Sequence, residues 1–243
     1  MTRDGSIKGM VEWARCHIKG RLTGADKLDD PRLRTLHRRC LAHDFKATLA
    51  QPLEETRFVI VDTETTGFHA YGGDEIVSVA LIEQRGLERT GEEYQTLVDP
   101  GRDVPEESRA VHGLTADMLR GQPTIVEVLP RLLEFIDDAV LVGHHINFDM
   151  RFLNKALLKN MYCQLGNPLV DTMLLHLAYS GRMGHYTLED VARYCQVEIH
   201  DRHTAHGDAE ATAEIFNILT RQMMTPGMTV GSLQRCQGGP HAV

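Results

Sequence analysis

The sequence of 243 residues lacks a long hydrophobic run, and no stretch approaches the roughly 18 apolar residues that a membrane-spanning helix needs. Its first 20 residues carry scattered charges and no apolar segment, which argues against a secretory signal. Cysteine is scarce too, with five residues far apart and no Cys-x-x-Cys pair. These absences exclude an integral membrane protein, a disulfide framework and a zinc ribbon, and they predict a cytoplasmic protein with reduced thiols.

Aromatic residues make up only 6% of the chain, with a single tryptophan, and we find no internal repeat or low-complexity tract. The composition, 42% hydrophobic and 25% charged, is that of an ordinary globular protein and excludes a disordered or fibrous chain. The length then predicts one main domain with appendages.

The net charge of −8 is unevenly distributed, because residues 1–50 carry +5 and the remainder carries −13. An acidic main body argues against nucleic-acid binding through a broad basic face. It remains compatible with an enzyme whose acidic residues hold divalent metals, because bound cations reverse the local sign of the charge.

Hydrophobic patterning divides the chain into a basic helical extension (residues 1–55), an α/β domain (56–223) and a flexible tail containing Gly and Pro (224–243). The extension is predicted to form two helices, one over residues 6–21 and one beginning at Asp30-Pro31. Packing of these helices on the main domain is favoured over an arm that contacts DNA or a partner. They are too short to form a large core of their own.

The main domain begins with short apolar segments that are typical of buried strands. Residues 58–61, 76–82 and 94–98 predict an antiparallel meander, and residues 140–143 predict a further strand. Apolar residues at helical spacing predict helices over residues 125–136, 148–159, 169–180, 187–195 and 206–222. This order of elements predicts an α/β fold with a mixed sheet.

Two acidic residues, Asp62 and Glu64, follow the most apolar of these strands. Side chains two positions apart point to one face of a strand, so these carboxylates are expected to lie side by side. Such neighbours repel and raise each other's pKa unless a cation neutralises them. A solvated strand end is the alternative for this pair taken alone.

Two further aspartates begin helices. Asp149 is either a helix cap or a carboxylate that needs a partner, since Phe148 and Phe152 indicate a buried helix face. Asp208 leads the inward stripe of the last long helix, and His203 lies five residues before it. Four carboxylates and one histidine suit two Mg²⁺ ions, with Mn²⁺ as a substitute, because hard divalent cations prefer oxygen ligands.

Four segments occur in order along the main domain: Val61-Asp62-Thr63-Glu64-Thr65-Thr66-Gly67, Val111-His112-Gly113-Leu114-Thr115, His144-x4-Asp149 and His203-x4-Asp208. This ordered set resembles the DEDDh (DnaQ-like) 3′→5′ exonuclease family and is similar to its epsilon-type proofreading branch. The resemblance extends from about Arg57 to Met223. It implies a ribonuclease H-like fold with a mixed five-stranded sheet flanked by helices, and hydrolysis of a 3′-terminal nucleotide with two metal ions.

The resemblance also implies a role for each matching residue. Four acidic residues would bind the metals and one histidine would be the general base; these are Asp62, Glu64, Asp149, Asp208 and His203. Thr204 stands where the tyrosine branch of the family has its tyrosine, which favours the histidine branch. Thr65, Gly67 and Phe68 would contact the terminal nucleotide, and His112 would frame the same pocket. For Phe68 a core aromatic is an equal alternative.

Three other features need separate interpretation. His145 departs from the family pattern, which often has Asn there, and leaves open how the Asp149 loop is held. Asp171 is expected to support the site rather than bind metal. The spacing of His200, His203 and His206 suggests zinc, but no partner cluster completes a tetrahedral site, so zinc is disfavoured.

We therefore expect a metal-dependent 3′→5′ exonuclease that releases nucleoside 5′-monophosphates from single-stranded 3′ ends. DNA is favoured over RNA on overall similarity to the epsilon-type branch, and a DNA polymerase is an expected partner. An RNA-trimming exonuclease of the RNase T or oligoribonuclease type is one alternative. A non-catalytic module that binds a polymerase or nucleic acid is another, disfavoured because all four acids and the histidine are present.

Overall fold

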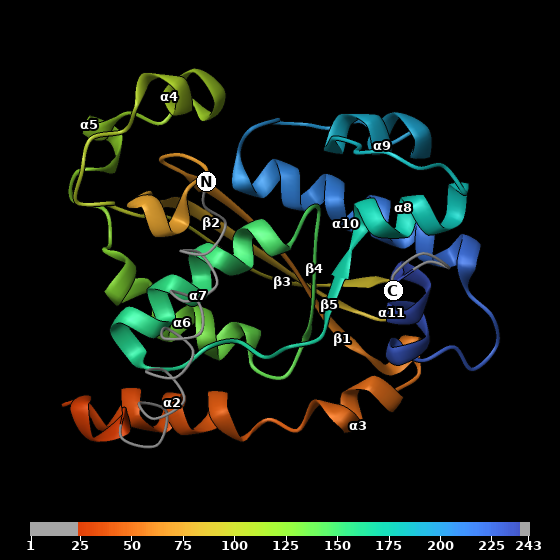
Figure 1. Ribbon diagram of the computed structural model, residues 1–243, viewed down its shortest axis with the longest axis horizontal. Helices are drawn as coiled ribbons and strands as arrows, with labels where there is room; N and C mark the ends of the chain where they lie inside the picture. Colours follow the sequence, from red (N-terminus) through yellow and green to blue (C-terminus); the bar gives the residue numbers. More distant parts are fainter. Residues whose placement is uncertain (1–23, 239–243) are drawn as a thin grey trace, which may run out of the picture.

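A central mixed sheet organises the computed structural model, which describes residues 24–238 (Figure 1). Its five strands run in the order β3-β2-β1-β4-β5. β2 pairs antiparallel with both β1 and β3, while β4 pairs parallel with β1 and β5 pairs parallel with β4. The strands are β1 Arg57–Thr65, β2 Ile76–Arg85, β3 Glu88–Leu97, β4 Val140–Gly143 and β5 Leu169–Asp171. The predicted meander and mixed sheet are thus confirmed.

Strict alternation along β1 divides the apolar residues between two cores. Phe58 and Ile60 lie in the core on one face of the sheet, and Val59 and Val61 lie in the core on the other. The alternation continues past the apolar run. Asp62 and Glu64 therefore point toward the face that carries Phe58, and Thr63 points toward the opposite face.

Helices cover both faces of the sheet (Figure 1). Those beside Val59 and Val61 are α2 Pro31–Ala42, α6 Ile125–Ile136 and α7 Asn147–Met161. Those beside Phe58 and Ile60 are α8 Thr172–Ser180, α9 Leu188–Cys195, α10 Ala205–Met223 and α11 Val230–Gly238. Shorter elements are η1 Ala25–Lys27, α3 Phe45–Ala50, η2 Leu53–Glu55, η3 Ala70–Gly72, α4 Glu106–His112 and α5 Ala116–Leu119. Among the described residues, no helix combines the length and apolarity that crossing a bilayer requires.

The second predicted helix of the extension is present and packs on the domain. α2 begins at Pro31, and the side chain of Asp30 accepts a hydrogen bond from the backbone of Arg32 as its N-cap. Leu36 is buried in the core that includes α6, and Arg32 forms an ion pair with Glu134 on α6 at 2.7 Å. The helix predicted over residues 6–21 lies outside the described residues.

The predicted flexible tail is wrong for residues 228–238. Val230 and Leu233 are fully buried in α11, and the backbone of Val230 donates to the carbonyl of Gln51 at 3.1 Å. Gln234 and Gln237 donate to the carbonyl of Leu169 at 2.9 and 3.4 Å, so α11 covers the edge of β5. Gly and Pro content alone could not indicate this packing, because the apolar residues that drive it are few and widely spaced.

Other boundaries also differ from the prediction. Residues 169–171 form β5, and the helix predicted over 169–180 begins only at Thr172. β3 begins at Glu88 rather than at Tyr94, because its exposed first half pairs through the backbone and contributes no apolar residues to the pattern. Neither α4 nor α5 was predicted, since both are too short to establish a helical period.

Candidate active site

The sheet and the first turn of α10 bring three carboxylates together. Asp62 and Glu64 are two apart on β1, and a register irregularity follows directly, between Glu64 and Thr65. Asp208 lies in the first turn of α10 and is buried. One ligand atom from each of these three residues lies within 4.8 Å of the others. The expected side-by-side arrangement on β1 is therefore present, with a third carboxylate added from a distant part of the chain.

The fourth carboxylate reaches the cluster from the other face of the sheet. Asp149 is buried in the first turn of α7, and its Oδ1 accepts a hydrogen bond from the Thr63 hydroxyl at 2.7 Å. Its charge raises the pKa of Asp62. Asp149 is thus the buried carboxylate with partners rather than a simple helix cap.

The four carboxylates strongly disfavour simultaneous ionisation. Burial raises the pKa of Asp62 well above its usual range, and the charges of Asp149, Asp208 and Glu64 raise it further. Burial and the Asp208 charge raise the pKa of Glu64 to about 8, although the Arg202 charge opposes them. Burial also raises the pKa of Asp149 to about 7, against the hydrogen bond from Thr63. A site of this kind needs positive charge before it can hold four carboxylates ionised at neutral pH.

Divalent cations fit this donor set. The ligands are carboxylate oxygens, which Mg²⁺ and Mn²⁺ prefer, and the raised pKa values show the negative charge that a cation would neutralise. Asp62, Glu64 and Asp208 could hold one ion between them, and Asp149, whose charge raises the pKa of Asp62, is the fourth carboxylate that could help to hold a second. The histidines singled out for zinc do not join this group, and His206 instead contacts Glu93 on β3 at 3.2 Å.

Arg202 is a charged residue of the site that sequence reasoning missed. Its guanidinium hydrogen-bonds to Asp208 Oδ2 through Nη1 and to Glu189 Oε1 at 2.7 Å through Nε. The Arg202 hydrogen bond lowers the pKa of Glu189 to about 2. The sequence offered one signal for Arg202, its position immediately before His203. Its pairing with Glu189 could not be predicted, because that pairing depends on how α9 and the following loop fold.

His203 lies in the same loop, beside the carboxylates. Its backbone N–H donates to Asp208 Oδ1 at 3.4 Å, and its φ of 64° is in the left-handed region. Gly207 allows the loop to close, because a Cβ there would lie 2.3 Å from the carbonyl oxygen of His200. Burial raises the pKa of Asp208 and lowers that of His112, and the charge of His203 acts to lower both, so its side chain is within electrostatic range of each.

His112 is the last residue of α4 and lies near Thr65 and His203. Burial lowers its pKa, and its Nδ1 accepts a hydrogen bond from the backbone of Leu114 at 3.1 Å. The backbone of Thr65 lies against the ring and acts to raise the pKa, against the effect of burial. His112 and Thr65, both predicted to contact the terminal nucleotide, therefore lie side by side.

The turn after β1 is built around Asp74. This carboxylate accepts hydrogen bonds from the Thr66 hydroxyl at 3.2 Å and from the backbone of His69 at 3.0 Å. A Cβ on Gly67 would lie 2.5 Å from Asp74 Oδ2, so a side chain at this position would break the turn. The hydroxyl of Thr65 donates to the Gly67 carbonyl at 2.7 Å.

Phe68 projects from this turn into solvent. It is 79% exposed, and its ring meets that of Phe148 at an angle, with ring centroids 6.1 Å apart. The alternative that it is a core aromatic is therefore wrong. Its exposed ring face remains available for stacking with a base.

The Asp149 loop is held by the residues around His145. The backbone of His145 donates to Asp171 Oδ1 at 3.1 Å, and the same oxygen accepts from Met173 at the start of α8. The rings of His144 and His145 both contact the carbonyl of Tyr186, at 3.0 and 3.2 Å. Burial lowers the pKa of His144 to about 4, so it is neutral. These contacts give Asp171 the supporting position expected of it.

Comparison with known proteins agrees with this arrangement. The sequence profile of the RNase_T exonuclease family matches residues 59–216. A Rhodobacter capsulatus DNA polymerase III subunit epsilon-like protein is 41% identical over 184 residues, which are 73% of this chain and 26% of that protein. The Aquifex aeolicus DNA polymerase III subunit epsilon is 38% identical over 159 residues, 65% of this chain and 78% of that subunit. The chain therefore spans about a quarter of one relative and most of the other.

Solved structures share the fold at lower identity. E. coli exonuclease I in complex with a dA16 oligonucleotide has a TM-score of 0.60 and 17% identity, covering 69% of this chain and 41% of that one. At this identity the likeness concerns the fold alone. It confirms the predicted ribonuclease H-like arrangement of a mixed five-stranded sheet with flanking helices.

Proposed function

Because this chain belongs to the RNase_T exonuclease family, matched over residues 59–216, we propose that this proofreading-type 3′→5′ exonuclease hydrolyses single-stranded DNA ends to nucleoside 5′-monophosphates. The observation that carries the proposal is the convergence of Asp62, Glu64 and Asp208 within 4.8 Å, with Asp149 beside them. A buried acidic cluster of this kind is costly unless it holds cations.

Enzymes of this family depend on divalent metals, and Asp62, Glu64, Asp149 and Asp208 would hold two Mg²⁺ ions here, with Mn²⁺ as a substitute. When bound, such ions lower the pKa of a water molecule and neutralise charge that develops at the phosphate. The four carboxylates would fix where this chemistry can occur, because β1 carries Asp62 and Glu64 while the first turns of α7 and α10 carry Asp149 and Asp208.

His203 would accept the proton of the attacking water. The water oxygen forms the new bond to phosphorus, and the bond from phosphorus to the leaving 3′-oxygen breaks. The leaving 3′-oxygen takes up a proton from solvent, so the products are a nucleoside 5′-monophosphate and a shortened strand with a free 3′-hydroxyl. Histidine is the side chain that most often transfers protons as a general base in enzymes.

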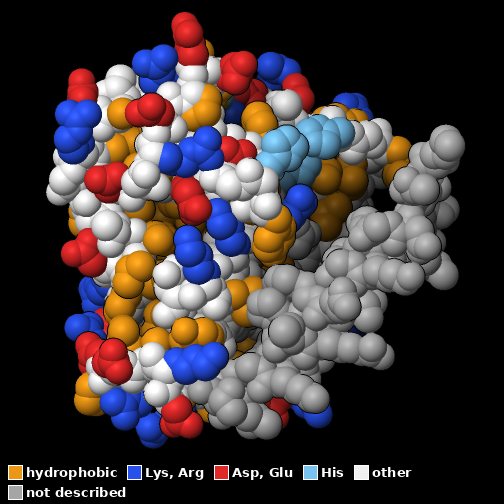
Figure 2. All heavy atoms as spheres, turned by 60° about the vertical axis from the view of Figure 1, so that its left-hand side comes forward, with side chains coloured by type: hydrophobic (Ala, Val, Ile, Leu, Met, Phe, Trp, Pro, Cys, Tyr) orange, Lys and Arg blue, Asp and Glu red, His pale blue; other side chains and the backbone are white. Residues whose placement is uncertain are grey.

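Thr65, Gly67, Phe68 and His112 would hold the terminal nucleotide. The exposed ring of Phe68 would stack on the base, and the ring of His112, beside the backbone of Thr65, would contact the sugar or phosphate. On the face shown in Figure 2, acidic and basic side chains are interspersed over the described residues rather than gathered into a broad basic surface. Recognition through a few site residues at a strand end is consistent with that distribution.

The relative named as DNA polymerase III subunit epsilon and another named as DNA polymerase III PolC-type support a polymerase as a partner of this chain. RNA trimming remains the second candidate, because no described contact distinguishes a 2′-hydroxyl. A non-catalytic binding module is disfavoured, since an acidic cluster with raised pKa values has no use in one.

The test compares 5′-labelled single-stranded DNA, a duplex with a mispaired 3′ end and single-stranded RNA, each with Mg²⁺ and with Mn²⁺. We expect stepwise shortening from the 3′ end, fastest on the unpaired DNA, and none for Asp208→Asn. Absence of hydrolysis of all three substrates by folded protein would overturn the proposal, and faster RNA hydrolysis would establish the second candidate.

A further inference from the structure

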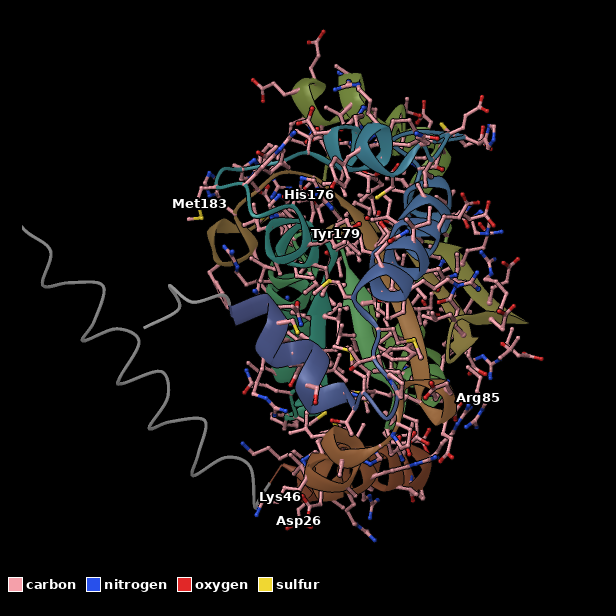
Figure 3. All side chains as sticks on the ribbon, turned by 90° about the vertical axis from the view of Figure 1, so that its right-hand side faces the viewer. Asp26, Lys46, Arg85, His176, Tyr179 and Met183 are labelled. Carbon is pink, nitrogen blue, oxygen red and sulfur yellow. The ribbon has the colours of Figure 1, made fainter. Side chains whose placement is uncertain are left out.

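A pocket of about 350 Å³ opens between α8 and α9, away from the carboxylates. His176 of α8 lines it together with Arg182 and Tyr186 from the connecting loop and Tyr194 of α9. Figure 3 faces this side of the molecule and labels His176 and Tyr179 on α8 and Met183 in the loop that follows. None of the roles described above uses this pocket.

The aromatic rings of the pocket are held at defined angles. His176 meets Tyr186 and Tyr194 edge to face, with ring centroids 4.8 and 4.6 Å apart. Tyr194 is nevertheless 41% exposed and Tyr186 is partly exposed. Because these tyrosine rings pack against His176 while part of their surface stays exposed, they provide a stacking platform. Such a platform binds planar groups at little cost in side-chain entropy.

His176 supplies an unused polar atom within this platform. The residue is 1% exposed, and its Nδ1 has no hydrogen-bond partner among residues 24–238. Burial and the Arg182 charge lower its pKa, so the ring is neutral at neutral pH. A buried neutral imidazole without a partner for Nδ1 costs free energy unless a ligand or water satisfies it.

Two arginines make the rim of the pocket positive. Arg182 forms no ion pair with the described residues, while Arg193 has a 77% exposed side chain and contacts Asp190 at 3.3 Å. Asp190 is also engaged by the N-cap of α9, where it accepts hydrogen bonds from the backbone and the hydroxyl of Thr187. The carboxylate is therefore largely occupied, and Arg182 is available to an anion.

The pocket is connected to the catalytic residues through short contacts. The Tyr186 carbonyl that borders it accepts from the loop before Asp149, where His185 also stacks on His145 with centroids 4.4 Å apart. Glu189, which holds Arg202, adjoins Asp190 in the same turn of α9. Adjacent residues of α9 thus line the pocket and hold the arginine that pairs with Asp208.

We propose that this pocket binds a nucleotide, with the base on the exposed ring of Tyr194 and the phosphate at Arg182. The combination of exposed aromatic rings, an unpartnered imidazole nitrogen and an unpaired guanidinium matches a base with an attached phosphate. The inference rests on the proposed function, because a strand whose 3′ end lies at the carboxylates supplies such nucleotides along its length. A free nucleoside 5′-monophosphate has the same chemistry and is the other source.

The test uses the full chain carrying Asp62→Asn, which keeps oligonucleotides intact. Fluorescence anisotropy compares labelled (dT)2, (dT)4 and (dT)12, and calorimetry measures binding of thymidine 5′-monophosphate. The pocket variant adds Arg182→Gln and Tyr194→Leu, both at partly exposed positions that folding should tolerate. The matched control adds Arg131→Gln, an exposed arginine on α6 at the opposite face of the sheet.

We expect the affinity of the parent protein to rise from (dT)2 to (dT)12. We expect the pocket variant to bind (dT)12 about tenfold more weakly than the parent does, while the control binds it as the parent does. If the pocket takes free nucleotides instead, the variant loses one calorimetric binding event and keeps the length series. Identical length series and identical calorimetry in variant and control would overturn the inference. Failure of the wild-type chain to hydrolyse any nucleic acid would instead refute the proposed function, and calorimetry would still decide on the pocket.

Discussion

The hydroxyl of Thr63 donates a 2.7 Å hydrogen bond to Asp149 Oδ1, joining β1 to the first turn of α7 beneath the acidic cluster. Thr63 lies between Asp62 and Glu64 but points to the opposite face of the strand. One strand thus supplies two carboxylates on one side and the support for a third on the other.

Thr63→Val should weaken divalent-metal binding by about 10- to 100-fold, because a supporting hydrogen bond to a ligand is lost. It should also raise the pKa of Asp149 further, since the Thr63 hydroxyl lowers it. Calorimetric titration with Mn²⁺ measures the first effect. Thr63→Ser is the control that keeps the hydroxyl, and equal loss of affinity in both variants would show that packing rather than hydrogen bonding is responsible.

His203→Ala should lower kcat by about 10²–10⁴ while metal-supported binding of a 3′ end persists, because the residue is proposed to move a proton and not to hold metal. The residual activity should also lose the histidine limb of its pH profile. His206→Ala, three residues away and paired with Glu93, is the matched control and should retain kcat. A His203 variant that fails by losing metal would contradict the assignment.

Phe68→Ala should raise KM on single-stranded DNA more than it lowers kcat, because it removes a stacking surface that substrate and transition state share. The expected loss is about 1–3 kcal/mol of binding free energy, the usual range for a base on an aromatic ring. Steady-state kinetics on an oligonucleotide measures it. Tyr71, 62% exposed in the same turn region, gives the comparison Tyr71→Ala, which should have little effect.

The thermal stability of protein in EDTA should fall as pH rises from about 5 to 8. The folded-state pKa values of Asp149 and Glu64, about 7 and about 8, lie above the ordinary range near 4. Between those limits the native state holds protons that the unfolded chain has released. The contribution of these two groups to the free energy of unfolding is therefore fully present below about pH 4, and it is lost as the pH rises through the folded-state pKa values. Differential scanning fluorimetry measures this slope.

Two comparisons make the pH prediction specific to the site. Glu64→Gln should show a shallower slope in EDTA, because one of the titrating groups is absent. Addition of Mn²⁺ at pH 8 should raise the Tm of the parent protein more than that of the variant. Equal slopes in the two proteins would mean that other groups govern the pH dependence.

Much of this arrangement could be predicted where local pattern and packing agree. Alternation along β1 predicted a buried strand with Asp62 and Glu64 on one face, and Asp30-Pro31 predicted the start of α2. Burial then follows from the same periodicity that the sequence displays.

The missed features depend on partners that are distant or on elements too short to have a period. β5 has three residues and is stabilised by pairing with β4. Arg202 reaches Glu189 only because a loop returns beside α9. The exposure of Phe68 depends on the turn around Asp74, since an aromatic residue after a strand is equally compatible with a core position.

The glutamines of α11 have a consequence for the order in which the chain is made. The backbone of Asp171 donates to Gln237, a residue 66 positions later, so the outer groups of β5 stay unpaired until that later segment has been synthesised and has folded. During this interval the nascent sheet presents an open edge at which another chain can add a strand. The interval ends when α11 folds, because its glutamines then occupy backbone groups of Leu169 and Asp171 along this edge.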